Sequence, residues 1–178
     1  RFIYWISDGL REKFKGSNLE HVLDIVSGLG TGDNNRFLRY WWEIDTNSIS
    51  IDGDTSLNKW VKYSKGGASN KWYGNIWLTV NWENSGKEII NCRDKNGRQK
   101  SRPQNRQYYF KKGITCSGRS SSKGMSYRVM PENQIFDVGA TGIIPKNGDK
   151  IDYFLSLLNS KLIAYIIKCL NPTVNTSE

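Results

Sequence analysis

The chain has 178 residues, of which 26 are Lys or Arg and 17 are Asp or Glu, so its formal net charge is +9. This length suits a single domain with a sizeable core, and a hydrophobic content of 37% is ordinary for a globular protein. No apolar run reaches the roughly 18 residues of a membrane span, and no signal peptide opens the sequence. We therefore expect a cytoplasmic protein without a membrane partner, and because it begins at Arg1 we expect a fragment of a longer polypeptide.

One helix and a series of short strands are predicted in the first four fifths of the chain. Residues 6–15 fit a short amphipathic helix capped by Ser7 or Asp8. Residues 28–33 form a glycine-rich turn, 45–58 a polar loop and 85–92 a helical turn. Alternating polarity and β-branched or aromatic content predict strands at 22–26, 37–44, 59–63, 77–82, 113–117, 126–130, 134–138 and 142–145.

The C-terminal part has a different periodicity. Apolar side chains recur there at three- and four-residue steps: Ile151, Phe154, Leu155, Leu158, Leu162, Tyr165, Ile166 and Cys169. This spacing predicts two amphipathic helices that meet near Asn159 and Ser160 and end before Pro172. The expected fold is α+β, with a mixed, mostly antiparallel twisted sheet, a helix at the N-terminus and a helical pair at the C-terminus.

The positive charge is concentrated in one window. Residues 93–128 contain eleven basic residues and one acid, Asp94, so the window carries about +10 and the remaining 142 residues about −1. Such a segment in an otherwise balanced chain is typical of nucleic-acid binding, although a solvated basic loop has the same composition. Aromatic residues lie between the charges, and we expect them to anchor the segment to a core: Tyr108, Tyr109, Phe110 and Tyr127.

The cysteines and histidines give little indication of a metal site or of redox chemistry. The three cysteines are widely spaced without a Cys-x-x-Cys pair, and His21 is the only histidine, so neither a disulfide framework nor a zinc site is expected. No lysine follows an acid at two residues' distance, which excludes the Asp/Glu-x-Lys core of a common class of metal-dependent nuclease.

The run from Val22 to Gly32 offers an enzyme reading. A hydrophobic strand leads into Gly28, Gly30 and Gly32, similar to the first motif of S-adenosylmethionine-dependent methyltransferases, in which glycines let the backbone approach the cofactor. That motif needs a following helix, whereas 37–44 is predicted as a strand. The Asp/Asn-Pro-Pro-aromatic loop of amino-methyltransferases is also absent, since Asn171 and Pro172 match only its start.

The run of residues 27–38 resembles a stretch of large bacterial adenine-specific DNA methyltransferases, including the BREX phage-defence methyltransferase and fused type II restriction–modification enzymes. Further segments resemble the same proteins in the same order: 65–67, 71–74, 80–84, 101–105, 109–115, 135–137 and 158–161. The resemblance covers nearly the whole chain and implies a single target recognition domain, residues 1–178, of the TaqI-like C-terminal specificity kind. It further implies that the catalytic domain, with its S-adenosylmethionine, belongs to the rest of the polypeptide, so no catalytic, cofactor or metal residue is expected here.

We expect this domain to read double-stranded DNA. Arg102, Arg106, Lys111 and Lys112 are predicted to contact phosphates. Base contacts are predicted along the next stretch, where arginines suit guanine and hydroxyls suit either base type: Thr115, Ser117, Arg119, Ser126 and Arg128. Arg36 is expected on the DNA backbone beside a structural Asp33, and Lys65 and Lys71 near a phosphate at a Gly-Gly turn.

The tryptophans leave one more reading open. All seven lie in the first half of the chain: Trp5, Trp41, Trp42, Trp60, Trp72, Trp77 and Trp82. We expect most of them in the core and Trp72, between turn residues, facing a ligand. An exposed aromatic patch would instead favour a protein-interaction module.

Overall fold

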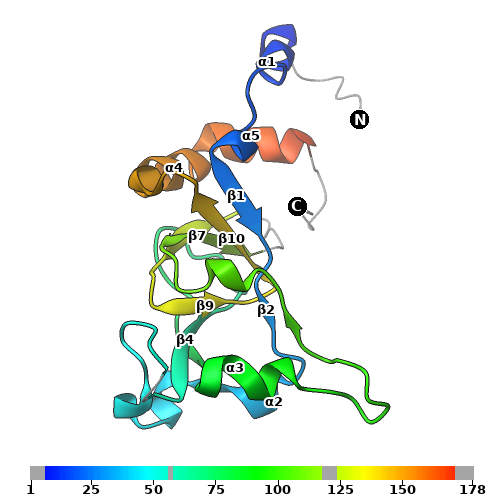
Figure 1. Cartoon of the computed structure of the whole chain (residues 1–178). Helices are drawn as coiled ribbons and strands as arrows, with labels where there is room; N and C mark the ends of the chain where they lie inside the picture. The colour runs from blue at the N-terminus through cyan, green and yellow to red at the C-terminus, as the bar shows by residue number, and fades with distance from the viewer. Residues whose placement is uncertain (1–6, 56–57, 118–123, 171–178) are drawn as a thin grey trace.

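The computed structural model describes residues 7–55, 58–117 and 124–170. Figure 1 shows an elongated molecule with α1, α4 and α5 at one end and α2 and α3 at the other, and two sheets between them. The first sheet is fully antiparallel in the order β1 (Leu23–Val26), β10 (Ala140–Pro145), β7 (Gly113–Ser117) and β8 (Tyr127–Met130). Strands from both ends of the chain therefore pair in it.

The second sheet has the order β3 (Leu38–Tyr40), β5 (Leu78–Asn81), β4 (Trp60–Ser64) and β9 (Gln134–Phe136). Its pairs are antiparallel except for β4 and β9, which run parallel. A small ladder joins β2 (Leu29–Gly30) to β6 (Arg102–Pro103). This ladder connects the glycine-rich segment to the basic window.

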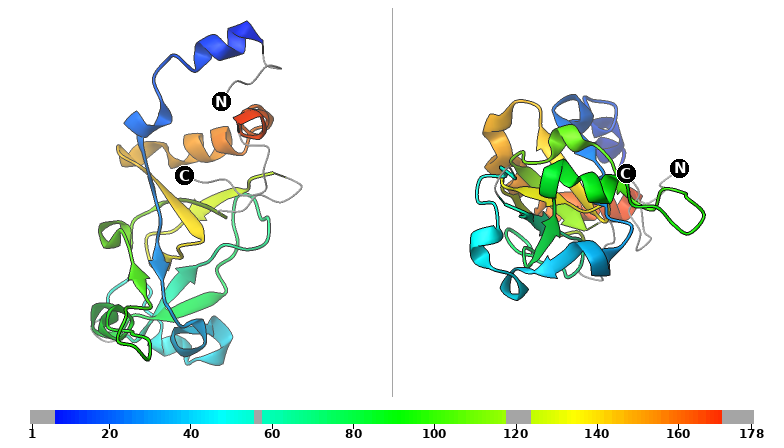
Figure 2. Two further views of the ribbon diagram at one scale, coloured as in Figure 1. Left: turned by 90° about the vertical axis from the view of Figure 1, so that its right-hand side faces the viewer. Right: turned by 60° about the horizontal axis from the view of Figure 1, so that its bottom comes forward.

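The helices are short and lie at the two ends of the molecule (Figure 2). They are α1 (Asp8–Lys13), α2 (Asn34–Phe37), α3 (Glu83–Ile90), α4 (Ile151–Leu158) and α5 (Lys161–Leu170). Five 3-10 turns complete the outline: η1 (Leu19–His21), η2 (Trp41–Glu43), η3 (Thr46–Ser48), η4 (Arg106–Tyr108) and η5 (Gly148–Lys150). The α+β class, the mostly antiparallel pairing and the helical pair at the C-terminus are as expected from the sequence.

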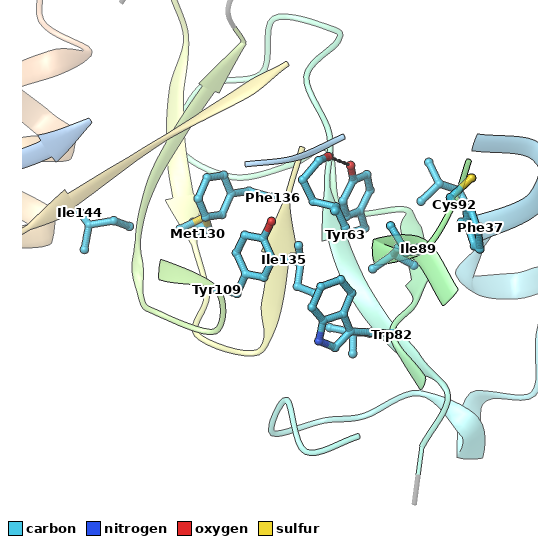
Figure 3. Close-up of a cluster of buried hydrophobic side chains, with 14 residues drawn as sticks. Phe37, Tyr63, Trp82, Ile89, Cys92, Tyr109, Met130, Ile135, Phe136 and Ile144 are labelled. Carbon is cyan, nitrogen blue, oxygen red and sulfur yellow. Dashed lines mark hydrogen bonds between the residues drawn. The ribbon is translucent and has the colours of Figure 1, made fainter. Parts of the chain in front are cut away.

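Two apolar clusters hold the architecture together. The larger one lies within and beside the second sheet, and Figure 3 shows Tyr109 between Phe136 and Trp82. There Tyr109 meets Trp82 and Phe136 edge to face, at ring-centroid distances of 5.5 and 5.8 Å. The hydroxyl of Tyr63, fully buried, lies 2.6 Å from the Leu29 carbonyl oxygen and so fixes β2 against β4. The other cluster packs α4 on the first sheet, through Phe154, Leu155 and Leu158 among others.

The strand predicted over 37–44 is wrong for most of its length. The Asp33 carboxylate accepts a hydrogen bond from the Arg36 amide at 3.1 Å and caps the helical turn α2. Only Leu38–Tyr40 is a strand, since Glu43 accepts from the Tyr40 amide at 2.8 Å and starts η2. Local side-chain capping thus overrides the β preference of the aromatic run. The predicted helical turn at 85–92 is α3, which contains Asn84, Ser85 and Gly86 at φ 50, 58 and 74°.

In the described part of the chain, no helix by itself has the length and apolarity to cross a membrane. The pair α4 and α5 meets that test only when taken together, across a bend of 61°. Phe154, Leu155 and Leu158 of α4 are buried against the first sheet.

Candidate nucleic-acid interface

The basic window forms a continuous path along the surface from the end of α3 to β7. It leaves α3 as a projecting loop, returns through β6, turns at η4 and enters β7 (Figure 1). Its side chains are exposed over most of this path: Arg93, Lys95, Arg98, Lys100, Arg102, Arg106, Lys111 and Lys112. The four predicted phosphate contacts therefore share one exposed segment.

The middle of this path is held by specific contacts to the body. Asn105 has φ 52° and donates from its Nδ2 to the Ser27 carbonyl at 2.9 Å, which fixes the start of η4. The Arg106 guanidinium stacks over the Trp82 ring at 5.9 Å and donates to the Ser85 carbonyl at 3.4 Å. Arg106 has no carboxylate partner within 4.0 Å among the described residues.

The aromatic residues of the window anchor it, as expected. Tyr109 and Tyr127 are 5% and 6% exposed, and the Phe110 amide donates to the Gln134 carbonyl at 3.1 Å. The Tyr108 hydroxyl donates to Asp24 at 2.9 Å, and this bond to a carboxylate raises the pKa of Tyr108. Lys111 places its ammonium 5.2 Å from the Tyr108 ring. Buried rings thus hold the path while its charges face solvent.

The residues predicted for base contact lie mostly inside the protein. Thr115 and Arg128, cross-strand partners in β7 and β8, are 0% exposed, and Ser117 and Ser126 are also buried. All four side chains are buried in this conformation, and the segment after β4 covers two of them: Ser117 Oγ donates to the Gly67 carbonyl and Arg128 donates to the Lys65 carbonyl. The sequence could not reveal this cover, which comes from a distant segment. The other predicted base reader, Arg119, lies outside the described residues.

Arg128 is an uncompensated buried cation. Its Nη2 donates to the Lys65 carbonyl at 3.4 Å, while Nε and Nη1 have no partner among the described residues. Desolvation by burial lowers its pKa. Burying such a group without a partner lowers the free energy of unfolding. The composition gave no sign that this arginine would be buried.

Of the three predicted contacts outside the window, two side chains have partners within the protein and the third is half-buried. Arg36 forms an ion pair with Glu88, which raises its pKa, and its guanidinium lies 4.9 Å from the Phe37 ring. Lys71 donates to the Asn159 carbonyl at 3.2 Å. Lys65 is half-buried beside Gly66, where an added Cβ would overlap the Gly139 backbone. The first half of the Gly-Gly turn is therefore used for packing within the protein.

The glycines of the 28–32 run serve backbone packing as well. A Cβ on Gly28 would lie 2.6 Å from the Phe136 carbonyl carbon, and one on Gly32, at φ 77°, would lie 2.7 Å from the Ser101 nitrogen. A single helical turn, α2, follows them instead of a full helix. Within the described ranges, no group of three His, Cys, Asp or Glu side chains could hold a metal ion.

Four tryptophans lie on the surface; exposure was expected of Trp72, but for Trp41, Trp42 and Trp77 it is contrary to the expected Trp-rich core. Trp41, Trp42, Trp72 and Trp77 are 48%, 58%, 52% and 37% exposed, whereas Trp82 is buried. Trp41, Trp42 and Trp77 line a pocket of about 620 Å³ together with Ile49, Ile76 and Lys62. Their spacing in the sequence gave no signal that they would meet, because β5 brings Trp77 beside η2 through pairing with β3.

Comparison with known proteins bears on what this surface is for. No family model matches the sequence. The adenine-specific methyltransferase PglX of Lacticaseibacillus casei (strain Zhang) is 33% identical over 182 residues, covering 97% of this chain. The adenine-specific methyltransferase BrxX of Escherichia coli O9:H4 (strain HS) is 35% identical over 153 residues, covering 84%. The chain is homologous to a part of adenine-specific methyltransferases.

That part is small. The chain spans only 15% of the length of PglX and 12% of that of BrxX. The similarity thus confirms that the chain resembles adenine-specific methyltransferases and that the resemblance covers nearly the whole chain. The positions expected for DNA contact are not tested by this similarity.

Proposed function

We propose that residues 1–178 form a single DNA target recognition domain of an adenine-specific DNA methyltransferase that acts in phage defence or restriction–modification. Methyl transfer to adenine N6 would then belong to a catalytic domain elsewhere on the polypeptide, which would bind S-adenosylmethionine and contact this domain. The proposal is supported by two adenine-specific methyltransferases of which the chain matches a small share. The single structural observation behind it is the exposed, anchored path of cations, most of which have no carboxylate within 4.0 Å among the described residues.

The phosphate-contact role rests on charge that the protein does not use internally. Among the described residues, no carboxylate lies within 4.0 Å of Arg102, Lys111 or Lys112. A protein that places such cations on phosphates releases condensed counterions, so its affinity falls steeply with salt. A base contact by Arg119, which follows β7 in the sequence, stays part of the proposal, whereas Ser117 would reach a base only if its bond to Gly67 opened on binding.

Binding of duplex DNA by the 178-residue chain tests the first half of the proposal. Fluorescence anisotropy between about 50 and about 200 mM salt should show a steep loss of affinity. Replacing Arg102, Arg106, Lys111 and Lys112 together by Gln should reduce the slope of log affinity against log salt by roughly one per lost phosphate contact. A flat salt response of the unchanged chain would contradict phosphate contact.

Sequence recognition needs a separate test. Exchanging this segment for the matching part of PglX in the intact methyltransferase should move methylation from one DNA sequence to another, as read by methylation-sensitive sequencing. The isolated chain should transfer no methyl group from S-adenosylmethionine. If the exchanged enzyme stayed active and still methylated the original sequence, a recognition role would be excluded.

The exposed aromatic pocket favours a second candidate, a protein-contact module. Three partly exposed indole rings around an apolar pocket are typical of a surface that a protein partner covers. Trp42→Ala should then weaken association with the remaining polypeptide and leave DNA affinity unchanged. Loss of DNA affinity with intact association would instead assign these rings to the nucleic acid.

A further inference from the structure

The segment from Cys92 to Lys100 is a hairpin loop, closed by one isolated β-bridge, that projects from the body directly after α3 (Figures 1 and 2). Arg93 and Gln99 pair as antiparallel partners, and the Lys100 amide donates to the Cys92 carbonyl at 3.0 Å. Cys92 and Ser101 are 6% and 3% exposed, so the base of the hairpin is anchored in the body. Between them every side chain is exposed except the half-buried Asp94.

The tip is ordered by its only acid. The Asp94 Oδ1 accepts from the amides of Asn96 and Arg98, both at 2.8 Å, while the Asp94 amide donates to the Arg98 carbonyl at 2.8 Å. Gly97, at φ 77°, closes the turn and has nothing within 4 Å of an added Cβ. The carboxylate is therefore used inside the turn.

The cations of the hairpin have no comparable partner. In the described part of the chain, no carboxylate lies within 4.0 Å of Arg93, Lys95 or Arg98, and Lys100 meets Asp33 only at 3.8 Å. Residues 93–100 contain no hydrophobic side chain, so the hairpin buries no apolar surface of its own. An ordered, projecting and basic element without a core role is suited to an external polyanion.

We infer that the hairpin 92–100 is a DNA-inserting finger, which enters the major groove of the duplex and carries Lys95 and Arg98 to the phosphates or base edges. The inference rests on the proposed function and extends it to an element outside the residues assigned above. The major groove of B-DNA is about 12 Å wide and admits a two-stranded ribbon. Because the turn is already ordered before binding, little conformational entropy is lost on insertion.

Two charge-matched comparisons test the finger. Lys95→Gln with Arg98→Gln removes two cations from the tip, and Lys13→Gln with Lys161→Gln removes two exposed cations from α1 and α5 at the other end of the molecule. The tip variant should lower the salt slope of duplex binding by about two, and the distant variant by much less. Equal effects of the two variants would overturn the finger and leave DNA binding itself intact.

The second comparison separates shape from charge. Asp94→Asn keeps a side-chain oxygen for the turn, whereas Asp94→Ala removes it. Both variants lose the same negative charge. Asp94→Asn should bind duplex DNA at least as tightly as the unchanged chain, and Asp94→Ala roughly fivefold more weakly than Asp94→Asn. Equal affinities would show that the ordered turn contributes nothing and would contradict the inference.

Groove entry has its own readout. Asn96→Cys carrying a photo-crosslinker should crosslink to duplex DNA, and Ser156→Cys on α4, at the other end of the molecule, should not. The label should go to the introduced cysteine, because the native cysteines at 92, 116 and 169 are buried. Duplex RNA of the same sequence, whose major groove is deep and narrow, should crosslink poorly. Equal crosslinking of DNA and RNA would overturn groove entry, and absence of any DNA binding by the unchanged chain would remove both the finger and the proposed function.

Discussion

Asn159, at the break between α4 and α5, pairs with both backbone groups of Tyr127. Its Nδ2 donates to the Tyr127 carbonyl at 2.8 Å and its Oδ1 accepts from the Tyr127 amide at 3.1 Å. Both residues are buried. Tyr127 belongs to β8, at the edge of the first sheet, where the Trp72 amide also donates to the Tyr127 carbonyl at 2.9 Å. The Asn159 side chain shares this edge with the Trp72 segment and ties the C-terminal helices to it.

Asn159→Ala should destabilise the chain by about 2–3 kcal/mol, because the buried Tyr127 amide loses its acceptor. Asn159→Asp should also destabilise, since it removes one of the two donors to the Tyr127 carbonyl and buries a carboxylate. Urea unfolding measures both, with the exposed Asn147→Ala as control. A loss below about 0.5 kcal/mol would mean that the pair adds little.

Gly28→Ala should destabilise by about 2 kcal/mol or more, because its Cβ would overlap the Phe136 backbone and ring. Gly30→Ala is the matched control: its Cβ would lie 3.4 Å from the Arg102 Cβ, an ordinary contact. In thermal unfolding, Gly28→Ala should therefore have a clearly lower Tm than Gly30→Ala. A cofactor loop would predict the opposite pattern, in which both substitutions abolish saturable S-adenosylmethionine binding by an otherwise stable chain.

Arg128→Met should leave stability unchanged or raise it by about 1 kcal/mol. The substitution removes a buried guanidinium with two unpartnered nitrogens and replaces it by an apolar chain of similar length. DNA affinity and sequence preference should stay the same if the residue remains buried on binding. A selective loss of discrimination at one base pair, without loss of stability, would instead identify Arg128 as a base reader that becomes exposed.

Stability should fall at alkaline pH. Burial raises the pKa of Tyr63, Tyr109 and Tyr127 above the ordinary 10.0. These hydroxyls stay protonated in the folded chain and ionise near pH 10 in the unfolded one, so above about pH 10 the unfolded state binds fewer protons and the unfolding free energy decreases. Urea midpoints from about pH 8 to about pH 11 check this, and Tyr63→Phe should make the decrease shallower.

The C-terminal helices show how far the sequence alone could go. Their three- and four-residue spacing predicted both helices and the break near Asn159, because a helix face depends on neighbours in sequence. The strands at 113–117 and 59–63 likewise followed from local alternation. Capping by Asp33 and Glu43, by contrast, turned a predicted strand into α2, β3 and η2.

The sequence by itself determined the fold class, the helical ends and the location of the charge in one window, since all three follow from composition and local periodicity. Only the tertiary structure decided which charges are available. The segment after β4 covers Ser117 and Arg128, while the Asp94 turn leaves Lys95 and Arg98 exposed at the tip of a hairpin. Exposure depends on contacts between segments far apart in the chain, and a single sequence does not contain these as a local pattern.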